Sequence, residues 1–372
     1  MKPFYRLSSY LLFIPIITVT MALHSISYKE DKEVTSQGEI ELDNIRNHKA
    51  VPKDMVLIYD GGAHRSIKWD KDHFSPYIYS IKEGEHKLLF DGFLFLEIKD
   101  GNGRGFASGY EKLAARKIEW ENLLQNYFTE NNAIDALNAR VEDLMRNQTI
   151  AGNYEKRKVI ISIPEPIPNQ KDWGKLENRE LDFSNGEDRI AACKWYIEYA
   201  EQLFKKADFE YLELVGFYWL AEEATNSRDL AKYIADIVYQ KGYDFYWIPY
   251  FNSDGYQEWK RLGFNQVYYQ PNYFFNENVP YSQLEEACKR AKIHGMNMEV
   301  EFDERVLAKN GWGYRLDDYL DVFAQYEVLD SLNIAYYQGG DAFFRLSQSQ
   351  ESSDIALYNR LTDMIIKRQK QQ

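Results

Sequence analysis

From about residue 55 to its end, the chain alternates between short apolar segments and longer amphipathic ones. The apolar segments are rich in β-branched and aromatic residues and are bounded by Gly, Pro, Asn or Asp, a pattern typical of buried β-strands. Eight strands are predicted in this way: Met55–Asp60, Leu88–Ile98, Lys158–Pro164, Tyr211–Leu220, Asp244–Tyr250, Gln266–Gln270, Asn297–Asp303 and Asn333–Gln338.

Between the strands, apolar residues recur at steps of three and four, which predicts helices that each bury one face. Two such repeats are Ile190, Cys193, Ile197, Ala200, Phe204 and Ile355, Tyr358, Leu361, Ile365. Further helices are predicted over Tyr110–Phe128, Ala133–Arg146, Asp229–Gln240, Ser282–Lys292 and Leu316–Asp330. Ser282 stands three residues before Glu285, a spacing that predicts a capping box at the start of its helix.

Eight strands that alternate with helices predict an α/β protein with a (β/α)₈ barrel. The segment after strand two carries two helices between Gly109 and Arg146, and we expect it to pack outside the barrel as a helical insertion. The main alternative is an open, doubly wound sheet. Its nucleotide fingerprint is missing, because the first strand continues into Asp60-Gly61-Gly62-Ala63-His64 and not into G-x-G-x-x-G.

The first residues have the pattern of an export signal. Lys2 and Arg6 precede an apolar run from Tyr10 to Leu23, which is followed by the small residues Ser25 and Ser27. We therefore expect a signal peptide over residues 1–27, a polar linker over 28–53 and the barrel over 54–372, in a periplasmic or extracellular protein. An uncleaved N-terminal anchor is the alternative reading.

Composition narrows the class of ligand. The balance of 45 basic against 58 acidic residues argues against a sequence-independent nucleic-acid binder, whose affinity comes from neutralising phosphates, and against docking on anionic lipid. Aromatic residues make up 16% of the chain, and a surplus of Tyr and Trp suits the flat apolar faces of sugars. The two cysteines lie in predicted helices as core residues, and the six histidines form no H-E-x-x-H motif, so no metal or other cofactor is expected.

Strand seven carries a row of acids. Met298, Val300 and Phe302 alternate along it with three carboxylates, Glu299, Glu301 and Asp303, which therefore share the face turned toward the barrel axis. Like charges in a barrel repel each other and lose hydration, so they need either a counter-ion or a chemical function. Arg305 and Arg345 are the counter-ions that a purely structural role would use.

Glu222 and Glu223 follow strand four, beside Tyr218 and Trp219. Two carboxylates across a sugar-sized cleft can cleave a glycosidic bond, provided that burial raises the pKa of the acid. Glu222 and Glu301 are thus the predicted catalytic pair. Residues predicted to bind substrate at the strand ends are Asp60, His64, Asp91, Trp219, Glu223, Trp247, Asn252, Gln270, Asn272, Glu299, Asp303, Gln338 and Asp341; further sugar-stacking candidates are Tyr250, Tyr269, Tyr273, Trp312 and Tyr337.

Acids after strands four and seven resemble those of retaining glycoside-hydrolase barrels. The resemblance implies that Glu222, or Glu223, is the acid/base and Glu301 the nucleophile, although those enzymes usually have Asn where this chain has Ala221. More closely, three runs resemble a family of exported bacterial proteins known only as a domain of unknown function, over most of the chain from Met55. These runs are Leu89-Phe90-Asp91-Gly92-Phe93-Leu94-Phe95-Leu96, Gly216-Phe217-Tyr218-Trp219 and Gln270-Pro271-Asn272-Tyr273-Phe274-Phe275.

Taken together, these features predict an exported glycoside hydrolase that cleaves a poly- or oligosaccharide. A non-catalytic glycan-binding barrel with the same aromatic cleft is the first alternative. A phosphate- or metal-dependent barrel enzyme is the second, because Gly339-Gly340 follows strand eight where a phosphate site often forms, and the strand-seven acids could hold Ca²⁺.

Overall fold

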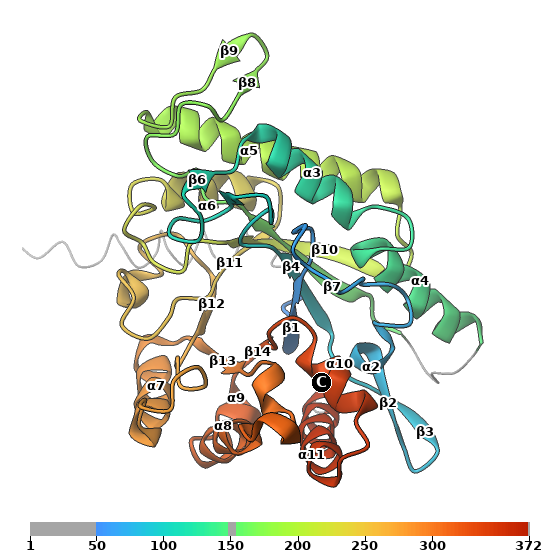
Figure 1. Cartoon of the computed structure of the whole chain (residues 1–372). Helices are drawn as coiled ribbons and strands as arrows, with labels where there is room; N and C mark the ends of the chain where they lie inside the picture. Colours follow the sequence, from blue (N-terminus) through green and yellow to red (C-terminus); the bar gives the residue numbers. More distant parts are fainter. Residues whose placement is uncertain (1–49, 148–153, 371–372) are drawn as a thin grey trace, which may run out of the picture. The chain divides into compact units, whose positions relative to one another are not determined.

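The computed structural model describes residues 50–147 and 154–370 (Figure 1). The predicted signal peptide and most of the predicted linker lie outside these residues. The two described segments belong to one compact unit. No helix in them is both long enough and apolar enough to cross a membrane.

Eight parallel strands form a closed barrel, in which neighbours in the chain are neighbours in the sheet and the last strand pairs with the first. The (β/α)₈ prediction is therefore confirmed and the open sheet is wrong. The barrel strands are β1 (Asp54–Tyr59), β4 (Gly92–Leu96), β7 (Arg157–Ile163), β10 (Leu212–Trp219), β11 (Asp244–Trp247), β12 (Gln266–Tyr269), β13 (Asn297–Glu301) and β14 (Ile334–Tyr337).

The predicted second strand, Leu88–Ile98, is divided in the structure. Residues Glu85–Leu88 form β3, which pairs antiparallel with β2 (Tyr79–Lys82) in a hairpin beside the barrel, and β4 begins only at Gly92. All residues of β1, β4, β7 and β11 are buried, because the strands of a parallel barrel are covered on both faces. This explains why they read as unbroken apolar runs.

Helices surround the strands in Figure 1, as the periodicity predicts. The predicted helix Ala133–Arg146 has the same bounds as α4. The helix predicted from Tyr110 begins only at Lys117, and the helix predicted over Leu316–Asp330 is divided in two. The helices are α2 (Ser75–Ile78), α3 (Lys117–Tyr127), α4 (Ala133–Arg146), α5 (Gly186–Ala207), α6 (Ala231–Gln240), α7 (Tyr281–His294), α8 (Gly313–Gln325), α9 (Val328–Ser331), α10 (Ala342–Gln348) and α11 (Ser352–Gln369), with short 3₁₀ turns at Tyr256–Glu258, Glu304–Val306 and Ala308–Asn310.

The predicted capping box at Ser282 is wrong. Helix α7 begins one residue earlier, at Tyr281, and its N-cap residue Pro280 offers no side chain to cap it. Ser282 therefore lies inside the first turn, where its hydroxyl cannot act as an N-cap. Helix α5, in contrast, is capped by Asn185, whose side chain accepts a hydrogen bond from the backbone N–H of Glu187 at 3.0 Å.

The insertion after strand two packs outside the barrel, as expected (Figure 1). It contains two short strands, β5 (Arg104–Gly105) and β6 (Leu113–Ala114), followed by α3 and α4. The Trp120 ring on α3 meets Trp173 and Tyr196 edge-on, with ring centroids 5.5 and 5.6 Å apart, which fixes the insertion against α5 and the loop before it. That loop carries the hairpin of β8 (Lys175–Leu176) and β9 (Arg179–Glu180).

Candidate active site

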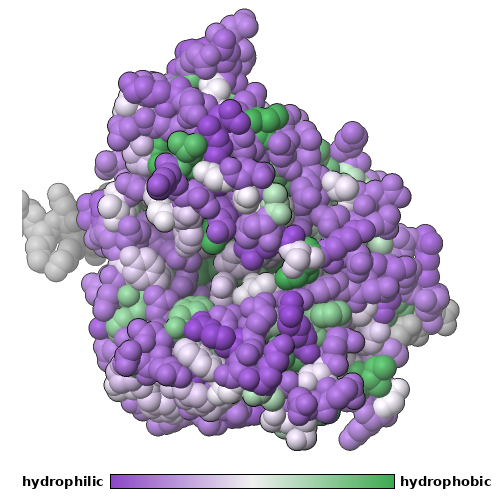
Figure 2. Space-filling view, viewed as in Figure 1, coloured by the Kyte–Doolittle hydropathy of each residue, from purple (hydrophilic) through white to green (hydrophobic). Residues whose placement is uncertain are grey.

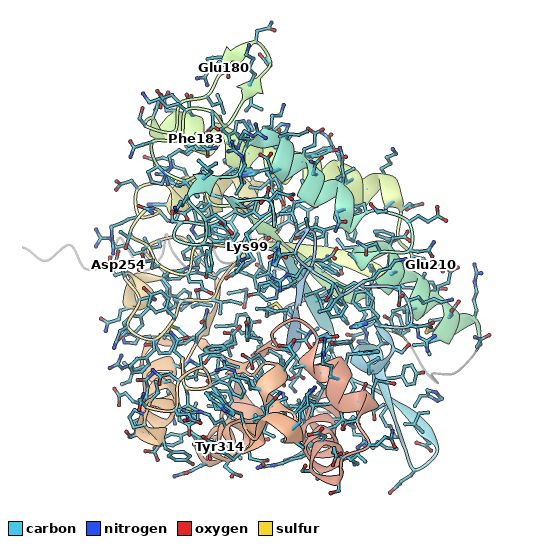
Figure 3. All side chains as sticks on the ribbon, viewed as in Figure 1. Lys99, Glu180, Phe183, Glu210, Asp254 and Tyr314 are labelled. Atoms are coloured by element: carbon cyan, nitrogen blue, oxygen red, sulfur yellow. The ribbon has the colours of Figure 1, made fainter. Side chains whose placement is uncertain are left out.

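A cavity of about 410 Å³ lies where the barrel strands end, a size typical of small-molecule sites. Figure 2 shows a hollow near the middle of this face, and Lys99, which lines the cavity, is labelled near the middle of Figure 3. We call it the central cavity; it is lined by Leu57, Tyr59, His64, Arg65, Ile98, Lys99, Tyr110, Tyr218, Glu222, Ile248, Gln270, Asn272, Phe275, Glu299, Glu301, Tyr337 and Gly339.

Glu301 ends β13 and is fully buried. One of its carboxylate oxygens, Oε2, accepts a hydrogen bond from the Tyr319 hydroxyl on α8, while Oε1 has no partner among the described residues. Burial raises the pKa of Glu301 to about 8, although Tyr319 and the backbone N–H groups of Asn272 and Tyr273 act to lower it. Oε1 is therefore a buried acceptor without a donor, in a residue that lines the cavity.

Glu299 lies two residues earlier on the same inner face of β13, and its side chain is also buried with Oε1 unpartnered among the described residues. Burial raises the pKa of Glu299 well above its ordinary value, and the nearby charges of Glu301 and Glu222 raise it further. Because no hydrogen-bond donor among the described residues offsets these effects on Glu299, we expect it to hold its proton most tightly of the three acids.

Glu222 faces the same cavity from the loop after β10 and is half-buried. The Nε2 amide of Gln270 donates to its Oε1 at 3.1 Å and also donates to the Ile248 carbonyl at 2.9 Å, which fixes the amide orientation. Burial raises the pKa of Glu222, and hydrogen bonds from Gln270 and Tyr110 oppose that shift. The acids of strands four and seven are therefore brought together as predicted.

Glu223, the other candidate acid after strand four, faces a different space. Its Oε2 accepts a hydrogen bond from the Tyr250 hydroxyl at 2.6 Å. It lines a neighbouring cavity of about 250 Å³, which we call the side cavity, together with Ala107, Ser108, Gly109, Tyr110, Glu165, Leu220, Ala221, Glu222, Asn226 and Tyr250. Of the two acids, only Glu222 lines the central cavity.

Arg65 forms one wall of the central cavity but does not offer it a free charge. Its Nε and Nη2 atoms donate to the two carboxylate oxygens of the fully buried Glu97 at 2.7 and 2.9 Å, and its guanidinium lies 4.9 Å from the centre of the Tyr59 ring. Partial burial lowers the pKa of the neighbouring His64. The charge of Arg65 is therefore balanced by Glu97, and the Lys99 ammonium in the same lining lies 3.8 Å from the Glu111 carboxylate.

Trp219 and Trp247, predicted to stack on sugars, are core residues. The Trp219 indole N–H donates to the Ser227 hydroxyl at 2.9 Å, and that of Trp247 donates to the Ala221 carbonyl at 2.8 Å. Side chains alternate along a strand, so when Tyr218 faces the cavity, Trp219 must face the helices. The aromatic walls of the cavity come instead from Tyr59, Tyr110, Tyr218, Phe275 and Tyr337.

Asp303, Asp341 and Gln338 have structural partners and do not line the cavity. The Asp303 carboxylate pairs with Arg305 at 2.7 to 3.0 Å, and that of Asp341 pairs with Arg345. Gln338 is buried, and its side-chain oxygen accepts hydrogen bonds from the Tyr77 hydroxyl and a backbone N–H. The arginine pairing that a structural role requires thus holds for these two aspartates but for neither Glu299 nor Glu301.

Three further candidates lie elsewhere. Asp91 is at the amino-terminal end of the barrel, where it accepts hydrogen bonds from Lys158 at 2.9 Å and from a backbone N–H, because β4 starts only after it. Asp60 accepts hydrogen bonds from Asn126 and Asn132 and lines a separate cavity of about 550 Å³. Asn252 is exposed and contacts Arg290.

The glycines after β14 do not form a free phosphate site. The backbone N–H groups of Gly340 and Asp341 both donate to the Oε1 atom of Glu304, at 2.9 and 3.1 Å, so an acid of the chain itself occupies that position. In residues 50–147 and 154–370, no three His, Cys, Asp or Glu side chains are grouped so that they could hold a metal ion.

Tyr110 and Tyr319 are site residues that sequence reasoning missed, as are Tyr59 and Phe275 in the cavity wall. Tyr110 comes from the insertion after strand two. The sequence predicted a helix from Tyr110 to Phe128, whereas Tyr110 lies before α3, in a loop that reaches the central cavity. Tyr319 lies at a regular apolar position of α8 and reads as core. The apolar repeat of α8 predicts that Tyr319 is buried, but it does not predict that the Tyr319 hydroxyl donates a hydrogen bond to Glu301.

Comparison with known proteins places the chain in a family. Residues 54–363 match the model of a domain of unknown function (DUF4855), and the chain belongs to that family. No curated protein matches the sequence.

Several solved structures resemble the chain at low identity. A candidate alpha-L-fucosidase from Bacteroides thetaiotaomicron is 13% identical over 86% of this chain and 97% of its own, with a TM-score of 0.43. A mutant tryptophan synthase alpha-subunit from Pyrococcus furiosus is 11% identical over 83% and 96%, with a TM-score of 0.37. CbXyn10B in native form is 14% identical over 59% and 76%, with a TM-score of 0.35. At these identities the resemblance carries no inference about activity.

Proposed function

We propose that this member of the DUF4855 family is a glycoside hydrolase that cleaves a poly- or oligosaccharide with Glu222 and Glu301. One observation carries the proposal: both acids line one cavity at the carboxyl ends of the strands, and neither forms an ion pair with any Lys or Arg of the described chain. Buried carboxyl groups without counter-ions destabilise a fold, so their retention in a cavity points to chemistry.

The positions of the two acids support different roles. Glu301 lines the central cavity and not the side cavity, and its Oε1 has no partner among the described residues. This carboxylate is therefore placed to bond to an anomeric carbon as a nucleophile. Glu222 lines both the central and the side cavity, so it lies where two adjoining sugar units would be linked. A general acid must reach the oxygen of that link.

The reaction then proceeds in two steps. Glu301 forms a bond to the anomeric carbon while the glycosidic C–O bond breaks and the proton of Glu222 passes to the leaving oxygen. In the second step Glu222 takes a proton from water, the water oxygen bonds to the anomeric carbon, and the Glu301 carboxylate is released. The product keeps the configuration of the substrate.

The other cavity residues support recognition of an uncharged sugar. Gln270 and Asn272 present amides beside the acids, and protonated Glu299 can donate a hydrogen bond to a hydroxyl group. His64 stands at the rim, and five aromatic rings supply apolar walls. The substrate is therefore expected to be a neutral carbohydrate bound without a cofactor.

Activity of the full chain on p-nitrophenyl glycosides and matching oligosaccharides tests the function. Glu301→Gln should abolish cleavage, and Glu222→Gln should reduce oligosaccharide cleavage by about 10²–10⁴-fold, the usual contribution of a general acid. Glu180→Gln, an exposed change on β9, serves as the matched control and should leave the rate unchanged.

Proton NMR of the first-formed product should show retained anomeric configuration; inversion would exclude the nucleophile role for Glu301. Full activity in folded Glu301→Gln would overturn the proposal. Glycan binding with no product on long incubation would favour a non-catalytic binding barrel.

The pattern of residues 1–27 further supports a proposal that the protein is exported to the periplasm or beyond the cell. N-terminal sequencing of the protein recovered outside the cytoplasm should begin at Tyr28. A retained Met1 in a membrane fraction would indicate the uncleaved anchor.

A further inference from the structure

The side cavity meets the central cavity at two residues, Glu222 and Tyr110, which line both. Its volume is about 250 Å³, against about 410 Å³ for the central cavity, so it leaves room for a ligand at least as large as one sugar unit. Because the expected acid/base stands at the junction, a substrate bound across it would have its scissile oxygen beside Glu222.

Glu165 is a buried acid in the wall of the side cavity that the reaction itself does not use. Only 2% of the residue is exposed. Its Oε2 accepts a hydrogen bond from the backbone N–H of Ser108 at 2.6 Å, while Oε1 has no partner among the described residues. A buried carboxylate oxygen without a donor is costly, and a ligand hydroxyl group would relieve that cost.

The backbone around Glu165 is held rigidly. Glu165 follows β7 between Pro164 and Pro166, and its own N–H donates to the Phe106 carbonyl at 2.8 Å. Asn226 donates to the Ser108 hydroxyl at 3.2 Å, and both residues line the side cavity together with Glu165. A fixed acceptor next to small polar groups recognises the hydroxyl groups of a sugar.

We propose that the side cavity binds the leaving-group sugar and that Glu165 accepts a hydrogen bond from one of its hydroxyl groups. This inference rests on the proposed glycoside hydrolase function. When the glycosidic bond breaks, the sugar that receives the Glu222 proton departs from the side cavity, and the sugar bonded to Glu301 stays in the central one. Glu165 is a positioning residue for the leaving-group sugar in the side cavity.

Two substrates that place the same sugar in the central cavity can distinguish binding of the leaving-group sugar by Glu165 from a general effect of Glu165 on catalysis or folding. The first is the oligosaccharide that the wild-type chain cleaves, and the second is the glycosyl fluoride of the same sugar, whose leaving group is too small to fill the side cavity. In Glu165→Gln, the ratio of kcat/KM for the oligosaccharide to that for the fluoride should fall at least about tenfold, the effect of losing one hydrogen bond to a charged group.

A second measurement uses the reverse reaction. With the glycosyl fluoride as donor, added leaving-group sugar should act as acceptor and form oligosaccharide in the wild type. The amount of this acceptor-dependent product should fall in Glu165→Gln and also in Asn226→Ala. The second variant keeps the test valid if the first one fails to fold. Glu180→Gln is again the control, and thermal melts report folding.

An equal loss on both substrates, or no loss on either, would overturn the assignment of the side cavity while leaving the hydrolase function intact. A wild-type chain that cleaves none of the p-nitrophenyl glycosides or oligosaccharides would overturn the proposed function and this inference with it. The two failures are thus distinguishable.

Discussion

At the scale of single residues, the buried acids of the site lower the stability of the folded state when they are ionised. Glu299 and Glu301 are buried side by side on β13 with one unpartnered oxygen each among the described residues. For Glu301 the folded-state pKa, about 8, lies above the ordinary value of 4.5. Between these two values the unfolded chain releases the proton while the folded chain keeps it, so stability must fall as pH rises through this window.

Glu301→Gln should therefore unfold at a higher temperature than the wild type at pH 8, and the difference should shrink toward pH 5. A gain of about 1 kcal/mol or more, or roughly 2 °C, is expected at the higher pH, because the variant avoids the buried charge. Thermal melts at both pH values measure it. A variant that is less stable at both would show that Glu301 holds the barrel together.

Tyr319→Phe tests how the nucleophile is tuned. The Tyr319 hydroxyl favours the charged form of Glu301, so its loss should raise the pKa of Glu301 further. Since Glu301 must be ionised to attack, the acidic limb of the kcat/KM profile, expected near pH 8, should move to higher pH. A loss of activity without any movement of that limb would contradict this role.

At the scale of elements, β10 positions the site. It carries Tyr218 and leads into Glu222, and its register against β7 shifts between Leu214 and Gly216. A Cβ atom at Gly216 would lie 2.3 Å from the Tyr246 ring and 2.6 Å from the Asp244 carbonyl oxygen. Strand β11 can approach β10 this closely only because the residue has no side chain.

Gly216→Ala should destabilise the protein by about 1–3 kcal/mol, since the added methyl group overpacks the contact with β11. Gly186→Ala is the matched control: it lies at the first position of α5 with no atom within 4 Å of its Cβ, and it should be neutral or stabilising. Urea unfolding of both variants measures the difference. Equal stabilities would mean that β10 relaxes freely.

At the scale of the whole molecule, the last helix closes the amino-terminal end of the barrel. Arg368 on α11 is buried, and its Nε donates to the buried Asp54 of β1 at 2.7 Å, while its Nη2 donates to the carbonyls of Lys53 and Leu332 at 3.0 Å. The Asp54 carboxylate also accepts from the Tyr336 hydroxyl of β14. First strand, last strand and last helix are thereby joined at a point remote from the site.

Arg368→Met should cost about 3–5 kcal/mol, because it leaves Asp54 buried without its counter-ion. Arg360→Met on the same helix should cost only about 0–1 kcal/mol, since that arginine is 39% exposed and its partners, Asp317 and Asp321, face solvent. Chemical denaturation of the pair compares them directly. Similar losses in the two variants would contradict a closing role for the buried pair.

The sequence by itself determined the order and number of the barrel strands, because each of these strands has a local apolar pattern that its neighbours do not obscure. It also located Glu222 and Glu301, because the end of a barrel strand is a recognisable position and strand seven alternates apolar and acidic residues. Seven of its site candidates line the central cavity: His64, Glu222, Gln270, Asn272, Glu299, Glu301 and Tyr337.

Only the tertiary structure decided which way the remaining side chains face. Strands covered on both faces show no alternation of polar and apolar residues, so nothing in the sequence told Trp219 in the core from Tyr218 in the cavity. The structure also showed that β4 begins at Gly92, so Asp91 lies at the amino-terminal end of the barrel, opposite the central cavity. Tyr110 and Tyr319 reach the acids from an insertion and a distant helix, and such contacts between remote segments exist only once the chain has folded.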